Sequence, residues 1–165
     1  MWLLIALIFG TLPTPPIPAL TPPIAGLTAK DLRDTFREIH NGHPHEAIDI
    51  MAPRGTPVHA VVPGTIRKLF LSKPGGNTIY EFDNASNYAY YYAHLDRYAD
   101  GLREGAYVNA GEVIGYVGST GDASALAPHL HFTIFALGPE KHWWKGTAVN
   151  PYAALLAAVK GRTWL

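Results

Sequence analysis

The chain has 165 residues, of which 48% are hydrophobic and 16% charged; this composition predicts one packed globular domain and excludes a disordered protein. Its 13 lysines and arginines balance its 13 aspartates and glutamates, so the charge gives no indication of a nucleic-acid partner. The absence of cysteine excludes disulfides and thiolate metal sites, but eight histidines leave nitrogen ligands available.

The first nine residues are apolar, a run too short to cross a bilayer, which takes about 20 residues. We predict that residues 1–12 are the core of a secretory signal or an uncleaved N-terminal anchor, although no basic residue precedes Lys30. The protein is thus expected to be exported to the periplasm, the cell envelope or the medium, with membrane contact only through this segment. Residues 13–25 hold six prolines and are predicted to form an extended spacer before a domain covering residues 26–165.

Short strands, with a short helix at each end, are predicted for that domain. A capping-box pattern at Thr28-x-x-Asp31 is followed by apolar residues at helical spacing, namely Leu32, Phe36 and Ile39. Runs rich in Val, Ile, Tyr and Phe predict strands over residues 58–62, 65–71, 78–82, 88–95, 113–117 and 130–135. An Ala- and Leu-rich stretch predicts a closing helix over residues 152–160. The pattern is typical of a mainly β domain, an antiparallel β-sandwich or a partly closed barrel.

Three segments carry histidines beside other ligand-type side chains: His43-Pro-His45-Glu-Ala-Ile-Asp49, Tyr92-Ala-His94-Leu95 and Pro128-His129-Leu-His131-Phe132. A catalytic zinc site takes three protein ligands and leaves one position for water. His45, Asp49 and His131 can supply two imidazoles and a carboxylate, which leaves His94 and His129 as proton carriers near neutral pH. The sequence therefore predicts a Zn²⁺ site with two further histidines beside it.

Strand geometry bears on this assignment. His129 and His131 would share one face of a strand, about 7 Å apart, so one could bind the metal while the other stands beside its bound water. Asp49 would lie about 13 Å from His45 on a straight strand. Both can bind one ion only if the chain bends between them, as at a bulge.

A helical alternative uses the same residues. His45-Glu46-x-x-Asp49 would then correspond to the helical His-Glu-x-x-His zinc motif, with Glu46 as the general base. Pro44 and Pro53 bracket this segment, and its two isoleucines favour a strand over a helix of several turns.

The spaced motifs resemble the lysostaphin-type zinc endopeptidases, family M23, whose domain is also called LytM. The matches cover about residues 30–155 in the order of the family: Asp34-Thr-Phe36, His45-x-x-x-Asp49, Ala52-Pro-x-Gly-Thr-Pro-Val58, Gly76-Asn77, Tyr92-x-His94-Leu95, Gly111-x-Val-Ile-Gly115, Gly118-Ser-Thr-Gly121, Pro128-His-Leu-His-Phe132 and Asn150-Pro151. Because several spaced motifs agree, the resemblance is specific.

The resemblance implies a zinc endopeptidase with an antiparallel β-fold and peptidoglycan peptides as the usual substrate. It implies His45, Asp49 and His131 as zinc ligands and His94 and His129 as catalytic histidines. It assigns no substrate-binding residue. The chain departs from the family where Arg is common, at His40 and His43, where Gly is common, at Ala47, and where Glu is common, at Thr133.

A non-catalytic module that binds the cell wall or activates another hydrolase is the alternative function. Relatives of that kind typically lack one or more ligand or catalytic residues, whereas this chain has all five, so we favour the enzyme. Three of the other histidines are predicted to be structural, whereas His43 is open between a structural role and a position on the substrate side. The three are His40, His59 and His142, which lack metal-like spacing. Trp143 and Trp144 are predicted to pack within a loop rather than to form a platform for a glycan. One strand face is expected to carry Tyr88, Tyr90, Tyr92 and His94, either as packing or as a wall of the cleft.

Overall fold

The computed structural model describes residues 15–40 and 42–161, so the predicted signal or anchor at residues 1–12 lies outside the described part. The elements in chain order are η1 (Ala29–Asp31), β1 (Ile39–His40), β2 (His43–Pro44), β3 (Ile48–Met51), β4 (Pro57–His59), β5 (Gly64–Ser72), β6 (Gly76–Asp83), β7 (Tyr88–Tyr98), β8 (Tyr107–Val108), β9 (Val113–Val117), β10 (His129–Leu137), β11 (Gly146–Val149) and α1 (Tyr152–Lys160). Within these residues, neither the 3₁₀ turn nor α1 has the length and apolar character that crossing a membrane requires.

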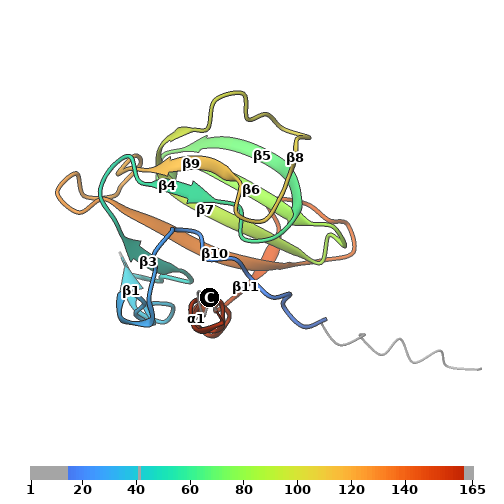
Figure 1. Ribbon diagram of the computed structural model, residues 1–165, viewed down its shortest axis with the longest axis horizontal. Coiled ribbons are helices and arrows are strands. Elements are labelled where there is room, and N and C mark those ends of the chain that lie inside the picture. The colour runs from blue at the N-terminus through green and yellow to red at the C-terminus, as the bar shows by residue number, and fades with distance from the viewer. Residues whose placement is uncertain (1–14, 41, 162–165) are drawn as a thin grey trace, which may run out of the picture.

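The main sheet is antiparallel, and its strands follow the order β11-β10-β7-β6-β5-β8 (Figure 1). Two further pairings extend it, because β3 adds to β10 and β9 joins the end of β7 to β4. The mainly β antiparallel fold is therefore confirmed. The sheet is not closed into a barrel, since its path runs from β11 at one end to β8 at the other.

The core lies on one face of this sheet, where β4 and β9 fold over it. Alternation along the strands sends Ile66, Tyr92 and Phe132 into this layer from β5, β7 and β10, and all three are fully buried. Leu155 of α1 is buried in the same cluster. Each such side chain contributes about 1.5–3 kcal/mol by leaving water. The odd-numbered side chains of β10 are consequently turned to the opposite face, which carries the candidate site.

The predicted N-terminal helix is reduced to the single 3₁₀ turn η1. The capping box forms as expected: the Thr28 backbone N–H donates to the Asp31 carboxylate over 2.8 Å, and the Lys30 N–H donates to the Thr28 hydroxyl oxygen over 3.3 Å. The predicted continuation through Leu32, Phe36 and Ile39 is wrong. The carbonyl groups of this stretch pair with later residues instead, since Phe36 accepts from the Glu46 N–H and Glu38 accepts from the His45 N–H.

The proline-rich stretch is extended, but residues 15–25 pack onto the domain and do not form a free spacer. Leu20 and Ile24 are buried in the core cluster. The backbone between the prolines also pairs with the domain, because the Thr21 N–H donates to the Val61 carbonyl over 2.7 Å. Proline lacks an N–H group but leaves its neighbours free to bond, so a tract of this kind can still dock. The domain therefore starts before the predicted boundary at residue 26.

One carboxyl group is buried in the core. Glu81 of β6 has no exposed surface, and the Tyr92 hydroxyl donates to its Oε2 over 2.5 Å. Its Oε1 has no hydrogen-bond partner among the described residues. Burial raises the pKa of Glu81 from 4.5 to about 8.

This raised pKa predicts a pH-dependent stability. Between these two pKa values the folded protein keeps a proton on Glu81 that the unfolded chain releases, so the free energy of unfolding falls as the pH rises from about 5 to about 8. The slope from one such group is at most about 1.4 kcal/mol per pH unit. Denaturant unfolding of metal-free wild type and Glu81→Gln across this range measures it. We expect a flatter profile for the variant, and parallel profiles would contradict the assignment.

Candidate metal centre and active site

Two of the three predicted ligands, Asp49 and His131, lie opposite each other on paired strands. In the antiparallel pair of β3 and β10, Asp49 is in register with His131. Residues opposed in this way point to the same face of a sheet. The Asp49 Oδ1 therefore lies 3.1 Å from the His131 Nδ1. Ile48 and Ile50, which flank Asp49, are fully buried in the core, and this anchors the strand that presents the carboxylate.

The third predicted ligand, His45, lies at a bend of the backbone. Between β2 and β3 the backbone turns at Glu46, whose φ is 55°, and His45 folds back over Asp49. The His45 Nε2 lies 3.1 Å from the Asp49 Oδ1 and 3.1 Å from the His131 Nδ1. The bend that the sequence required is thus present. The helical alternative is wrong, because residues 45–47 form no helix and Ile48 begins a strand.

Thr133 holds this bend in place. It is buried on β10, and its hydroxyl donates to the Glu46 carbonyl oxygen over 2.5 Å. No sequence motif predicts this role for Thr133, which stands where Glu is common in the family that the chain resembles. The same strand therefore carries one predicted ligand, His131, and the anchor of the segment that presents another, His45.

The three donor atoms fit a zinc ion. Each pair of them is separated by 3.1 Å. In a tetrahedral site with Zn–N and Zn–O bonds of about 2.0–2.1 Å, donors lie about 3.3 Å apart. The donor set of two imidazoles and one carboxylate is also one that catalytic zinc uses.

The charges of the cluster also suit a cation. Burial by itself would raise the pKa of Asp49, but hydrogen bonds and positive charge from His131 and His45 hold that pKa well below its usual range. Burial lowers the pKa of His131, and the Asp49 carboxylate offsets only part of this effect. For His45, burial lowers the pKa, but the hydrogen bond to Asp49, the negative charges of Asp49 and Glu38 and the bond to the Thr35 carbonyl together outweigh it, and the pKa is raised. Asp49 is thus ionised and His131 neutral near pH 7, the forms that bind metal.

Thr35 forms hydrogen bonds that orient two of the predicted ligands, His45 and Asp49. Its backbone carbonyl accepts a hydrogen bond from the His45 Nδ1 over 3.2 Å, which leaves the Nε2 lone pair facing Asp49. Its hydroxyl donates to the Ala47 carbonyl over 3.0 Å and accepts from the Asp49 N–H over 3.3 Å. The side chain is buried, and the sequence pointed to it only through the Asp34-Thr-Phe36 motif.

We expect Thr35→Val to weaken zinc binding by about 10- to 100-fold, the usual effect of removing a group that orients a ligand. Valine has the same shape but lacks the hydroxyl that ties Ala47 to Asp49. Competition with a chromophoric zinc chelator measures the affinity. Thr65→Val, on β5, is the matched control, and equal affinities for both variants and wild type would contradict the role of Thr35.

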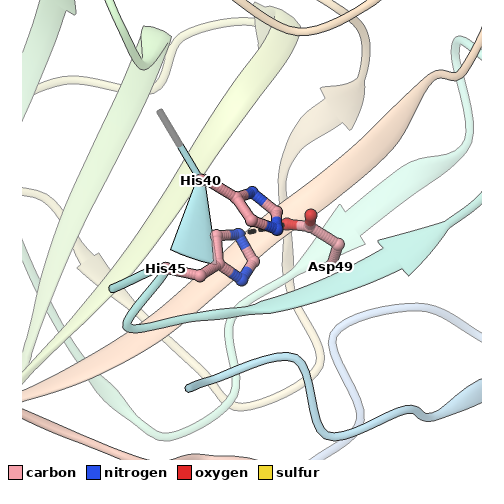
Figure 2. A group of neighbouring side chains, drawn as sticks. All are labelled: His40, His45 and Asp49. Atoms are coloured by element: carbon pink, nitrogen blue, oxygen red, sulfur yellow. Dashed lines mark ion pairs between the residues drawn. The ribbon is translucent and has the colours of Figure 1, made fainter. Parts of the chain in front are cut away.

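His40, for which the sequence predicts a structural role, joins this group. Its ring stacks on His45 with 4.1 Å between centroids, and one ligand atom each from His40, His45 and Asp49 lie within 4.8 Å of one another (Figure 2). Its side chain is 45% exposed, and its Nε2 lies 3.6 Å from the Glu38 carboxylate. Only the hairpin of β1 and β2 brings it here, and no spacing motif signals that hairpin.

The two predicted catalytic histidines lie beside the cluster with their tautomers fixed. The His129 Nδ1 is 2.8 Å from the Ala127 carbonyl, and the His94 Nδ1 is 2.8 Å from the Thr120 carbonyl. A carbonyl only accepts, so each Nδ1 carries the hydrogen and each neutral ring keeps a lone pair on Nε2. The His129 Nε2 lies 3.6 Å from the Asp49 Oδ1. The His94 ring is 4.9 Å from His129 and 5.4 Å from His131, between centroids.

His94 does not share a face with the tyrosines of its strand, contrary to our prediction. The register of β7 against β6 shifts between Tyr92 and Leu95, and His94 within this shift has a φ of 59°, so the bulge turns its ring to the site face. Tyr88, Tyr90 and Tyr92 are buried in the core. Hydrogen bonds from Asn77 stabilise the bulge, because its side-chain amide donates to the Leu95 and Asp96 carbonyls over 3.1 Å each. Burial lowers the pKa of His94, so its ring is neutral near pH 7.

All five predicted residues line one open cavity of about 550 Å³. Residues of two strands and two loops also line it. They are His40 of β1, Tyr91 of β7, which alternation turns to this face, and Pro74, Gly75, Asp122 and Ser124 of the loops. A cavity with clustered imidazoles, the Asp49 carboxylate beside them and fixed proton acceptors is suited to hydrolysis at a bound metal.

The sequence profile of peptidase family M23 matches residues 43–151, about two thirds of the chain. The chain belongs to peptidase family M23. Among curated members, lysostaphin of Staphylococcus simulans is 41% identical over 93 residues, which are 56% of this chain and 18% of that protein. The L-Ala--D-Glu endopeptidase of Bacillus subtilis (strain 168) is 34% identical over 118 residues, which are 68% of this chain and 35% of that protein. The M23 chain thus matches only about a fifth to a third of these relatives.

Solved M23 structures share the fold. The catalytic domain of lysostaphin from Staphylococcus simulans superposes with a TM-score of 0.60 and 32% identity, covering 83% of this chain and 88% of that domain. A putative glycyl-glycine endopeptidase lytM from Ruminococcus gnavus superposes with a TM-score of 0.68 and 30% identity, covering 79% of this chain and 55% of that one. The predicted membership and the predicted fold are both confirmed.

Proposed function

We propose that this M23 domain is a zinc-dependent endopeptidase that cleaves peptide bonds in peptidoglycan stems or cross-links. The observation that supports the proposal is the metal-binding cluster: the His45 Nε2, the Asp49 Oδ1 and the His131 Nδ1 lie 3.1 Å from one another. The same cavity is lined by His94 and His129. Matched relatives named as L-Ala--D-Glu and glycyl-glycine endopeptidases support peptidoglycan peptides as the substrate class.

The proposed zinc ligands are His45, Asp49 and His131. Bound there, zinc would polarise the scissile carbonyl and lower the pKa of water. Of the chain's own groups, His129 offers an Nε2 lone pair 3.6 Å from the Asp49 Oδ1, at the edge of the cluster, and accepts a proton from the attacking water. His94 keeps its Nδ1 hydrogen on the Thr120 carbonyl, so it would stabilise the developing oxyanion or protonate the leaving amine in the form that also carries a proton on Nε2.

The decisive test incubates the zinc-loaded protein with purified peptidoglycan and identifies the released peptides by mass spectrometry. We expect defined peptide fragments with new amino termini, and their loss when zinc is removed by a chelator and not replaced. A protein that binds zinc and sediments with peptidoglycan but releases no peptide would instead support the alternative function, a non-catalytic wall-binding or hydrolase-activating module.

Export is proposed together with this substrate, because peptidoglycan lies outside the cytoplasm. We expect a fusion of residues 1–30 to a reporter that works only outside the cytoplasm to be active, given the apolar run at the N-terminus. Replacing two leucines of that run by aspartate is the matched control and should abolish the signal. A reporter that stays inactive with the native segment would contradict export through this sequence.

A further inference from the structure

A continuous row of aromatic rings leads away from the metal centre across the site face of the sheet. Tyr91 of β7 lies 6.1 Å from His131 and 4.7 Å from Tyr80, its direct cross-strand partner on β6. Trp143, in the loop between β10 and β11, lies 5.0 Å from Tyr80, all distances being between ring centroids. Tyr91 also lines the catalytic cavity, so the row begins inside the site.

The far end of the row is exposed and held in a fixed orientation. Trp143 packs on Phe70 at 5.3 Å, and the Lys68 Nζ lies 5.9 Å from the centre of its ring. Trp144 meets Trp143 edge to face at 5.5 Å and stacks on His142 at 4.4 Å with 18° between the rings. Trp144 is nevertheless 63% exposed, so contacts fix its ring while most of its surface remains in water. We call the set Tyr80, Tyr91, Trp143 and Trp144 the aromatic ledge.

A hollow with both polar and apolar lining residues adjoins the ledge. Its volume is about 230 Å³, and its lining includes His142, the stacking partner of Trp144, with Glu140, Lys145 and Thr147. Aromatic faces beside hydrogen-bonding groups favour a ligand that is apolar on its ring faces and polar at its edges. A pyranose ring has this chemistry, since its C–H groups form the faces and its hydroxyl and acetamido groups lie at the rim.

We propose that the aromatic ledge binds an N-acetylhexosamine unit of a glycan strand while the attached peptide occupies the metal cavity. This inference rests on the proposed function, because the ledge starts at Tyr91 within the catalytic cavity. The residues named at the bonds that the relatives cut are Ala, Glu and Gly, none of which carries a ring that could stack on an exposed indole. The sugar to which such a peptide is joined supplies the larger face.

The binding test uses the zinc-loaded chain and a soluble tetramer of N-acetylglucosamine, followed by nuclear magnetic resonance titration. We expect saturable shifts for wild type and an affinity about tenfold lower for Trp144→Ala, the usual scale for truncating an aromatic anchor. Tyr107→Ala, which removes another exposed aromatic residue from β8, should bind like wild type. Trp144→Phe should recover part of the affinity. Absence of binding by wild type, or equal binding by Trp144→Ala, overturns the proposal.

A kinetic comparison separates this inference from the proposed function. Two substrates share one scissile peptide, and only one of them carries the disaccharide. We expect Trp144→Ala to lower the ratio of kcat/KM for the glycan-linked substrate to that for the sugar-free substrate by about tenfold. An unchanged ratio refutes the ledge. If wild type hydrolyses neither substrate, the proposed endopeptidase activity is refuted. The titration then still tests whether the aromatic ledge binds the sugar.

Discussion

Replacing His131 by alanine is expected to remove zinc from the protein, whereas replacing His40 by alanine is not. The two residues belong to competing ligand sets that share His45 and Asp49. The His131 Nδ1 is 3.1 Å from the donor atoms of both, and the register of β3 against β10 fixes it there. His40 approaches only within 4.8 Å, from a two-residue strand at an exposed hairpin. Moving such a group onto the ion would cost conformational entropy.

The measurement is zinc content per chain after dialysis against a weak chelator, with circular dichroism to establish folding. Wild type and His40→Ala should keep about one zinc, and His131→Ala, like Asp49→Ala and His45→Ala, should keep close to none. His59→Ala removes a histidine outside the cavity and serves as the control. Zinc lost from His40→Ala but retained by His131→Ala would assign the centre to His40, His45 and Asp49.

The second large effect should separate catalysis from metal binding. His129→Ala and His94→Ala are expected to keep zinc and to lose about 100- to 10,000-fold in turnover of a defined cross-linked peptide, the range for a general acid or base. Both rings are fixed by backbone carbonyls at Nδ1 and present Nε2 to the cavity. Neither donates one of the three atoms that lie within 3.1 Å of one another.

Glu46→Gln is the control for this pair. In the discarded helical alternative Glu46 is the base, whereas in this fold only its backbone matters, since it carries the bend and its carbonyl accepts from Thr133. We therefore expect Glu46→Gln to keep zinc and nearly full activity. Full activity of both histidine variants together with an inactive Glu46→Gln would falsify the mechanism.

The sequence predicted the long strands well because they are periodic. The runs at 65–71, 78–82, 88–95, 113–117 and 130–135 all lie within the strands β5, β6, β7, β9 and β10. The short elements were missed, since a two-residue strand such as β1 carries no periodicity, and its pairing depends on contacts between residues 36–38 and 45–46. The same limit explains the helix wrongly predicted beyond Asp31.

The candidate site shows the same division. The positions of Asp49 and His131 on strand faces followed from alternation, and the need for a bend after His45 followed from distance alone. The register that places Asp49 opposite His131 is a long-range pairing, which the sequence does not specify. The orientation of His94 depends on a bulge that breaks the alternation, so periodic reasoning put it on the wrong face.

The alignment of β10 has a consequence for refolding. His129, His131 and Thr133 occupy alternate positions on this strand, and Leu130, Phe132 and Ile134 lie between them in the core. A slip of one residue would exchange the two sets, burying the imidazoles and exposing the apolar side chains. No slipped state could then assemble the metal cluster. Zinc added during renaturation should consequently favour the correctly aligned chains by mass action. The amount of zinc bound per chain would then measure the fraction of chains with the native register.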